Sequence, residues 1–262
     1  MAYTLKRIRK YLFIILPVVL AITFFSRNNY RSVADINSEV LRDPIQTQLQ
    51  SANPITFQKD NFSYTITPLY DYDIAGLLVH HLNYNTWYSL SRVDSVFPTD
   101  LCLIWGDNVK NGSYKSKSVR FTQDFRFCLY YYSGNDIPIN NSEASNNHLV
   151  IQSDDLKKVA DNLNTGDQVR IKGKLVNVEA RPIGNNKGDY EPNDLIWPTS
   201  VTRDDSGAGA CEVIYVESIQ VLKKGNPVSN LFFLLSGYGL FLVVIWAILE
   251  MFYTVFLARQ KA

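Results

Sequence analysis

The residues best suited to chemistry lie in one polar run, Arg203-Asp204-Asp205-Ser206-Gly207. Two adjacent carboxylates beside a flexible glycine could bind Ca²⁺ or act as a general acid and base. A solvent-exposed hairpin turn uses the same residue types, because Asp, Ser and Gly adopt the backbone conformations that turns require. We predict the turn, and we assign no catalytic residue to this run.

The three histidines are the next candidates: His80, His81 and His148. His80 and His81 are adjacent in a predicted strand, where successive side chains point to opposite faces, so they are poorly placed to share one metal ion. The chain has no His-x-x-x-His or Cys-x-x-Cys spacing of the kind that holds zinc. We therefore predict no metal site and no cofactor.

The three cysteines are Cys102, Cys128 and Cys211. In an oxidising compartment this number favours one disulfide and one remaining thiol. The sequence leaves all three pairings open. Cys102 with Cys128 is favoured, because both lie in candidate strands that are close in chain order. The remaining cysteine is more often a small buried apolar residue than a nucleophile.

Aromatic residues could line a groove for a sugar or a peptide, although they also fill cores and protein interfaces. Core or protein interface is the reading that we favour. Tyr84 and Trp87, together with Arg203, Asp204 and Asp205, are the candidate residues for binding a partner.

Two apolar runs lie near the ends of the chain, Tyr11–Phe25 and Leu231–Leu257. The first is short for a bilayer, which usually needs about 20 residues, and Pro17 interrupts it. It lacks the small residues of a cleavage site, so we predict an uncleaved signal anchor, with a cleaved signal peptide as the alternative. The second run is long enough to span a membrane by Leu249, which leaves Glu250 at the interface.

Basic residues flank the far end of each apolar run. They are Lys6, Arg7, Arg9 and Lys10 before the first run, and Arg259 and Lys261 after the second. Because cytoplasmic flanks carry excess Lys and Arg, both termini are predicted to be cytoplasmic and the segment between the runs to lie outside the cytoplasm. We expect a bacterial inner-membrane protein with a periplasmic domain.

The net charge of the chain is +1, but its positive charge is concentrated at the ends. Between Ser26 and Asn230, acidic residues exceed basic ones by about four, since the basic residues flanking the two runs fall outside this segment. Nucleic-acid-binding domains normally present a basic surface. The charge therefore argues against DNA or RNA as a partner.

The sequence divides into six segments. They are a cytoplasmic basic tail (1–10), a membrane helix (11–26), a helical linker (27–53), a β domain (54–224), a second membrane helix (231–250) and a cytoplasmic or interfacial tail (251–262). Within the linker we predict a helix over Arg31–Arg42, closed by Pro44.

Alternating or continuous apolar residues predict strands in the β domain. These are Thr56–Thr67, Ile74–Leu82, Leu101–Trp105, Val119–Tyr132, Gly166–Val178 and Cys211–Leu222. A helix begins at Ser153, a residue suited to an N-cap, and ends at Gly166. Two insertions interrupt the strands: Asn83–Asp100, with a helix near Trp87, and Arg181–Ala210, with Trp197–Thr202 predicted to pair with Cys211–Val216 as a hairpin.

Strands followed by a helix and further strands resemble the OB-fold, a small Greek-key barrel. The Gly-Asp-x-Val-x-Ile-x-Gly pattern at Gly166–Gly173 is similar to the strand that follows the helix in such domains. The chain is also similar to uncharacterised bacterial membrane-anchored proteins, through Asp100–Gly106 and Gly209–Glu212, a likeness that implies no activity. The expected fold is mainly β, an OB-like small barrel with one clear helix and long insertions, flanked by two transmembrane helices.

These features favour a non-enzymatic inner-membrane accessory or scaffold subunit, whose periplasmic domain mediates protein–protein contacts in a larger membrane assembly. Small residues at Ser236, Gly237 and Gly239 would allow close helix packing in the bilayer. The expected partners are the lipid bilayer and other inner-membrane or periplasmic proteins. The alternative is a periplasmic membrane-anchored hydrolase or metal- or ligand-binding enzyme that uses Asp204, Asp205 and a histidine.

Overall fold

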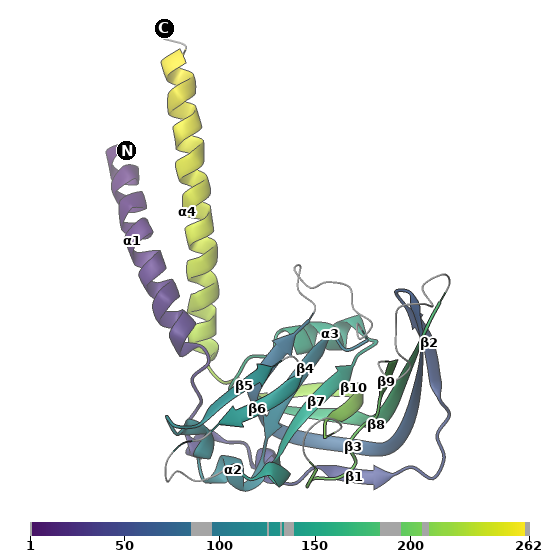
Figure 1. Ribbon diagram of the computed structural model, residues 1–262. Helices are drawn as coiled ribbons and strands as arrows, with labels where there is room; N and C mark the ends of the chain where they lie inside the picture. Colours follow the sequence, from purple (N-terminus) through teal and green to yellow (C-terminus); the bar gives the residue numbers. More distant parts are fainter. Residues whose placement is uncertain are drawn as a thin grey trace. The chain divides into compact units, whose positions relative to one another are not determined.

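The computed structural model of the chain (Figure 1) describes residues 2–84, 96–124, 126–131, 133, 139–183, 195–205 and 210–259. The chain divides into two units. The helical unit comprises Met1–Asn29 and Gly225–Ala262, and the β unit comprises Tyr30–Lys224.

The helical unit contains α1 (Ala2–Ser26) and α4 (Pro227–Arg259). Both include a stretch that is long and apolar enough to cross a membrane, Thr4–Ser26 and Pro227–Thr254. Pro17 lies inside α1 without ending it, whereas Pro227 is at the first position of α4, where its missing N–H costs no helical hydrogen bond.

The small residues of α4 contact α1 of the same chain. A Cβ atom added at Gly239 would lie 3.3 Å from the methyl groups of Leu16, and one at Gly237 would lie 3.8 Å from Leu20. Ser236 is buried, and its hydroxyl donates to the carbonyl of Phe232 at 2.7 Å. Gly237 and Gly239 therefore lie where α4 packs against α1.

Glu250 forms an ion pair with Arg9, and its other carboxylate oxygen lies 4.0 Å from Nζ of Lys6. Arg9 also lies over the ring of Trp246. The acid of α4 is thus paired with basic residues at the start of α1, and pairing of this kind is expected of an ionisable group close to a membrane span.

The described residues of the β unit form ten strands, of which eight form one mixed sheet and two form a separate hairpin. The sheet contains β1 (Ile45–Gln48), β2 (Ile55–Lys59), β3 (Phe62–Asn83), β4 (Thr99–Ile104), β7 (Ala144–Val150), β8 (Gln168–Pro182), β9 (Ile196–Trp197) and β10 (Glu212–Lys223). The hairpin is β5 (Arg120–Asp124) with β6 (Phe127–Tyr131). The helices are α2 (Gly106–Lys110) and α3 (Asp154–Asp161), with 3₁₀ turns η1 (Val33–Asp35), η2 (Ser38–Leu41), η3 (Ser113–Lys115) and η4 (Asn141–Glu143).

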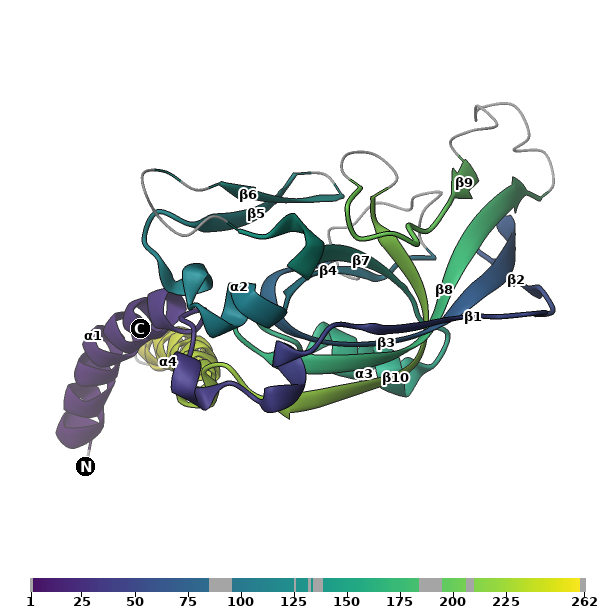
Figure 2. The same cartoon turned by 90° about the horizontal axis from the view of Figure 1, so that it is seen from below.

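The pairings of five strands follow one another in a cycle. β3 pairs with β4, β4 with β7 and β10 with β8, all antiparallel, while β7 and β10 are parallel. β8 then pairs with β3 along most of its length. Figure 2 shows the strong curvature of the sheet that these pairings require. Helix α3 lies between β7 and β8 in the chain.

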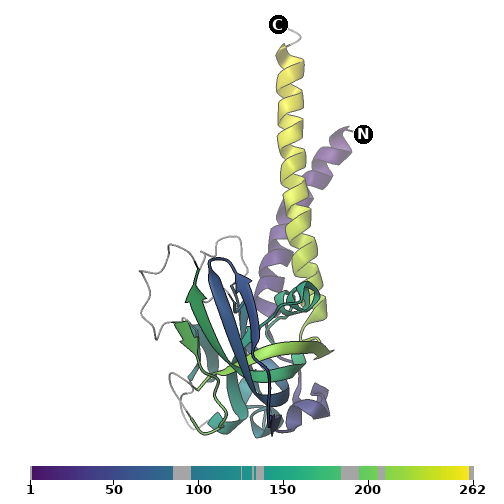
Figure 3. The ribbon, with the colours of Figure 1, turned by 90° about the vertical axis from the view of Figure 1, so that its right-hand side faces the viewer.

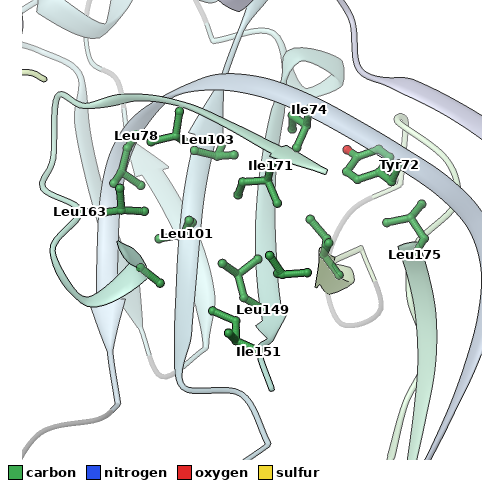
Figure 4. Close-up of a cluster of buried hydrophobic side chains, with 14 of the residues drawn as sticks. Tyr72, Ile74, Leu78, Leu101, Leu103, Leu149, Ile151, Leu163, Ile171 and Leu175 are labelled. Atoms are coloured by element: carbon green, nitrogen blue, oxygen red, sulfur yellow. The ribbon is translucent and has the colours of Figure 1, made fainter. Parts of the chain in front are cut away.

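The described residues form three groups of buried side chains, one of which packs Leu77, Val79 and Ile104 of the sheet against Val40 and Tyr114. The other two groups lie along the sheet. The first, drawn in Figure 4, lies on its concave side and includes Leu101, Leu149 and Ile171. The second includes Tyr64 and Val178, at the ends of β3 and β8 that extend beside β2 in Figures 1 and 3. The alternation that predicted β3 is real, since Phe62, Tyr64 and Ile66 are buried and the residues between them are partly exposed.

Gly173 is required where β8 pairs closely with β10. A Cβ atom at this position would lie 2.1 Å from the carbonyl oxygen of Tyr215, so any other residue would push the two strands apart. Gly166 has a φ of 93°, which suits the turn that follows α3. Local structure therefore explains why both ends of the Gly166–Gly173 pattern are glycine.

The N-terminal part of the β unit differs from the prediction of a helical linker up to residue 53. The predicted helix Arg31–Arg42 is replaced by the turns η1 and η2, and Asn37 caps η2 by accepting from the backbone N–H of Glu39. Arg170 binds Glu39 from the sheet, and Ile45–Gln48 pairs with β3. Tertiary contacts of the segment outweigh its helical pattern.

Two predicted strands are hairpins. Thr56–Thr67 turns at Asp60, which has a φ of 51°, and Val119–Tyr132 divides into β5 and β6. The predicted pairing of Trp197–Thr202 with Cys211–Val216 is wrong for β9, which pairs with β8, although the N–H of Ser200 donates to the carbonyl of Cys211.

The helix predicted from Ser153 is confirmed as α3, and Ser153 caps it. The strands predicted over Leu101–Trp105, Gly166–Val178 and Cys211–Leu222 correspond to β4, β8 and β10. The helix predicted near Trp87 lies outside the described residues.

Candidate functional site

A buried carboxylate, Asp100, is the centre of a polar cluster between the sheet and the β5–β6 hairpin. Its Oδ1 lies 2.8 Å from Nη2 of Arg126 and 2.8 Å from Nδ1 of His148. Its Oδ2 accepts from the Tyr84 hydroxyl at 2.9 Å and from Nε of Arg126 at 3.2 Å. Asp100 itself is fully buried. The cluster thus joins residues that are far apart in the sequence.

The alternation of two strands places this cluster on one face of the sheet. Leu101 and Leu103 of β4 enter the core, so Asp100 faces the opposite side. His148 is the register partner of Asp100 on β7. Arg126 comes from the turn between β5 and β6, and its guanidinium lies 4.5 Å from the centre of the Phe97 ring.

The Asp100 carboxyl is held in its charged form. Burial raises its pKa, but the hydrogen bond and charge of His148 and the charge of Arg126 outweigh burial and keep the pKa below its ordinary value. Because a buried charge without a partner is costly, Asp100 and Arg126 stabilise each other's position. Together they fix the hairpin on the sheet.

Two further contacts attach the hairpin. Cys102 of β4 and Cys128 of β6 form a disulfide, with their Cα atoms 5.8 Å apart. The Gln123 side chain of β5 lies 3.1 Å from Nδ1 of His80. Figures 1 and 2 show the hairpin beside β4 and β7. We call the three attachments, Arg126–Asp100, Cys102–Cys128 and Gln123–His80, the hairpin clamp.

The clamp leaves a cavity of about 380 Å³ between the hairpin and β7, which we call the β6–β7 cavity. Its walls are mostly apolar. They are formed by Phe127, Cys128, Leu129 and Tyr130 of β6, by Ala144, Ser145 and Asn146 of β7, and by Asn141, Asp205, Ala210 and Cys211. A concave apolar site with a few polar groups is the usual form of a binding site.

Cys211 is the free cysteine, and it borders this cavity. Its Sγ accepts from Nδ2 of Asn146 at 3.2 Å. Burial raises the pKa of the thiol to about 11, so the thiol is protonated at neutral pH. Since the thiolate is the reactive form, this environment does not favour nucleophilic catalysis.

The predicted polar run is divided between the interior and the surface. Arg203 turns inward, and its Nη1 donates to the buried Glu212 at 2.7 Å. Asp204 is exposed, and Asp205 accepts from the Ser200 hydroxyl at 2.5 Å. Burial raises the pKa of Glu212 to about 8 despite its contact with Arg203.

The histidines are likewise bound to other groups. The His81 ring contacts the Leu163 carbonyl at 2.9 Å and the Thr99 hydroxyl at 2.8 Å. Within the described part of the chain, no histidine contacts Asp204 or Asp205, and no three potential metal ligands come together. The described residues thus do not bring together the aspartates and the histidine that the alternative, a hydrolase or metal-binding enzyme, would use.

The candidate residues chosen from sequence have different outcomes. Tyr84 belongs to the Asp100 cluster, Asp205 borders the β6–β7 cavity, and Trp87 lies outside the described residues. Sequence reasoning missed Asp100 and Arg126. The available signal was an acid directly before the apolar run Leu101–Trp105, a position at which a strand that continued inward would need a partner for the charge.

Comparisons of the chain with protein-family models, curated proteins and solved structures found no match.

Proposed function

We propose that this protein is a non-enzymatic, membrane-anchored accessory or scaffold subunit whose β unit binds a partner protein. The observation that carries the proposal is the β6–β7 cavity, which is mostly apolar and is held by the hairpin clamp. An apolar hollow on a rigid scaffold favours binding over proton transfer.

The state of the nearby ionisable groups supports binding. The charge of Asp100 is balanced by the ion pair with Arg126, and Cys211 is held as a protonated thiol. A general acid, a base or a nucleophile must reach a substrate in a reactive form. Asp100 instead holds the hairpin on the sheet through Arg126.

The exposed aromatic residues of β6 support a protein as partner. Phe127 and Tyr131 are 41% and 58% exposed. Aromatic side chains are enriched at protein interfaces, whereas a nucleic-acid surface would be basic. The excess of acidic residues in the segment between the apolar runs favours the protein partner.

The cyclic strand order supports an OB-like arrangement. In an OB-fold five strands close into a Greek-key barrel. The order β3-β4-β7-β10-β8, with β8 returning to β3 and α3 between β7 and β8, is consistent with that topology. On the basis of this strand order and the place of α3, we propose an OB-like architecture for the β unit.

The basic flanks favour a β unit outside the cytoplasm, in the periplasm of a bacterium, with both termini cytoplasmic. The disulfide between Cys102 and Cys128 is consistent with that compartment, because cytosolic thiols are kept reduced.

Photo-crosslinking in intact membranes tests the proposal. The full chain would carry p-benzoylphenylalanine at position 127 or 131, with position 196 as control, because Ile196 is similarly exposed, at 47%, on β9. We expect one specific protein adduct from positions 127 and 131 and none from 196. The proposal fails if the two hairpin positions give no adduct, or only those given by position 196.

A further inference from the structure

Arg27 directly follows α1, at the helix end for which we propose a position outside the cytoplasm. Its guanidinium carbon lies 4.9 Å from the centre of the Phe24 ring and 4.3 Å from the centre of the Phe233 ring. Phe24 belongs to α1 and Phe233 to α4, so the cation contacts both helices of the helical unit. Aromatic rings attract a guanidinium and fix its position, but they leave its charge without a counter-ion.

Polar contacts hold the end of α1 beside the start of α4, which Figure 1 shows as neighbours. The Ser26 hydroxyl donates to the Ser229 hydroxyl at 3.1 Å. Nδ2 of Asn226 donates to the carbonyl of Ser26 at 3.0 Å and to that of Asn29 at 2.6 Å. Because these contacts fix the two helix ends, the helical unit holds the guanidinium over the two rings before any ligand binds.

The charge of Arg27 has no anionic partner in the described parts of the chain. Arg9 forms an ion pair with Glu250, and Arg7 donates to the Tyr11 hydroxyl at 3.4 Å. The Arg27 guanidinium, by contrast, makes no hydrogen bond to the described residues, and its Nε is buried without an acceptor. Arg27 as a whole is partly exposed, so its two Nη groups are the donors that a ligand can reach.

The ring contacts place this charge at the edge of the apolar part of the helices. The apolar run of α4 begins at Leu231, so Phe233 lies within its first turn. Contact with this ring turns the Arg27 side chain back toward that run. A cation at this level lies where the hydrocarbon core of a bilayer meets the headgroups, and lipid phosphates are the anions of that layer.

We propose that Arg27 binds the phosphate of a membrane phospholipid at this end of the α1–α4 pair. The inference rests on the membrane anchoring in the proposed function and adds a lipid to the protein partner. A guanidinium binds phosphate through two parallel N–H···O bonds and is less strongly hydrated than an ammonium, which suits the edge of the hydrocarbon core. The same helix ends expose Phe25 at 78% and Leu231 at 54%, which offers apolar surface to the acyl chains.

Native mass spectrometry of the full chain in dodecyl maltoside tests the inference. The probe is dihexanoyl phosphatidylglycerol, and the comparison lipid is dihexanoylglycerol, which carries the same acyl chains without the phosphate. Inorganic phosphate, added alone, distinguishes a free anion from a lipid. We expect the phospholipid to bind at least about tenfold more tightly than either comparison compound, a difference of about 1.4 kcal/mol.

Two variants locate the site. Arg27→Gln should weaken phospholipid binding at least about tenfold, because the amide carries no charge. Lys10→Gln is the matched control, since Lys10 is an exposed cation of the same helix, and it should bind the phospholipid as the wild type does.

A second measurement separates lipid binding from a purely structural role of Arg27. A ligand that binds the folded protein raises its Tm, so the phospholipid should raise the Tm of the wild type and of Lys10→Gln but not that of Arg27→Gln. Should Arg27→Gln disturb the packing of the helices, the comparison of phospholipid with dihexanoylglycerol on the wild-type chain still decides the question.

Equal binding of dihexanoylglycerol, or unchanged phospholipid binding in Arg27→Gln, would overturn the inference. Inorganic phosphate that binds as tightly as the phospholipid would overturn the assignment to a lipid. If the wild-type chain binds no phospholipid but gives specific adducts at positions 127 and 131, the inference fails and the proposed function stands. Phospholipid binding as expected, without any adduct, would contradict the proposed partner binding and retain the lipid site.

Discussion

Asp100 and Glu212 are both buried carboxylates of the β unit, but their environments shift their pKa values in opposite directions. Asp100 has donors on both oxygens, from Arg126, His148 and Tyr84. Glu212 is bound by Arg203 at one oxygen, and its Oε2 has no partner among the described residues. Burial dominates at Glu212 and is outweighed at Asp100. The number of donors, more than burial, decides which group stays charged.

Removal of Arg126 should have the largest effect. Arg126→Met leaves the buried Asp100 charge without its cation, beside His148, Tyr84 and Gln123, and breaking a buried ion pair from one side costs about 3–5 kcal/mol. We expect a loss of this size in the free energy of unfolding, measured by urea denaturation of the full chain in detergent. The double variant Asp100→Asn/Arg126→Met should recover much of the loss. If the double variant is as unstable as the single one, the charge of Asp100 is not the cause.

Removal of the disulfide should have the next largest effect. Cys102 and Cys128 are separated by 26 positions, and closing a loop of this length stabilises a protein by about 3 kcal/mol. Cys102→Ala/Cys128→Ala should lower the free energy of unfolding accordingly. If the ion pair alone can hold the hairpin, hydrogen exchange of the β5 and β6 amides should remain slow in this variant. Fast exchange would show that Arg126 and Asp100 depend on the disulfide for their position.

The pH dependence of stability should separate the two carboxylates. The folded protein holds the Glu212 proton more tightly than the unfolded chain, so the stability from Glu212 is complete below about pH 4.5 and is lost as the pH rises through about 8. Asp100 behaves in the opposite way, because its lowered pKa gives stability that is lost as the pH falls.

Glu212→Gln should therefore remove the loss of stability that occurs between about pH 4.5 and pH 8, a change on the order of a few kcal/mol between pH 5 and pH 9. Thermal unfolding of the full chain across this range measures it. Exposed Glu217→Gln on the same strand is the matched control and should leave the profile unchanged. A wild-type profile in Glu212→Gln would mean that Glu212 is ionised throughout the range.

The sequence predicted the elements whose apolar residues follow a local pattern, and it missed those held by polar contacts between distant residues. β8 and α3 bury apolar residues at a regular period, and β4 is a short apolar run that is buried along its whole length, so their patterns were informative. The division of Val119–Tyr132 was not predictable locally, because the turn at Arg126 contains no Gly, Pro or Asn, and Arg126 reaches a carboxylate on another strand. β7 was missed because it begins Ala-Ser-Asn-Asn, a polar sequence. The amides of Asn146 and Asn147 donate to the carbonyls of Arg126 and Leu101, contacts that only the folded chain provides.

At Cys211 the charge state of a buried thiol should depend on hydrogen-bond donors in the same way as that of the carboxylates. The change expected there is the smallest of those predicted. Among the described residues its Sγ accepts from Asn146 alone, and burial raises its pKa from the ordinary value of 9.0 to about 11. The thiolate fraction at pH 7 is then about 100-fold below that of an unperturbed cysteine, so alkylation by iodoacetamide should be slower by about the same factor. Mass spectrometry of the full chain across pH 7–11 gives the rate, which should rise tenfold per pH unit up to about pH 11. A plateau near pH 9 would contradict the raised pKa, and any remaining slowness would then reflect restricted access.

Asn146→Ala removes the donor and should shift the alkylation profile to still higher pH, as expected if donors set the charge state of buried groups in this protein.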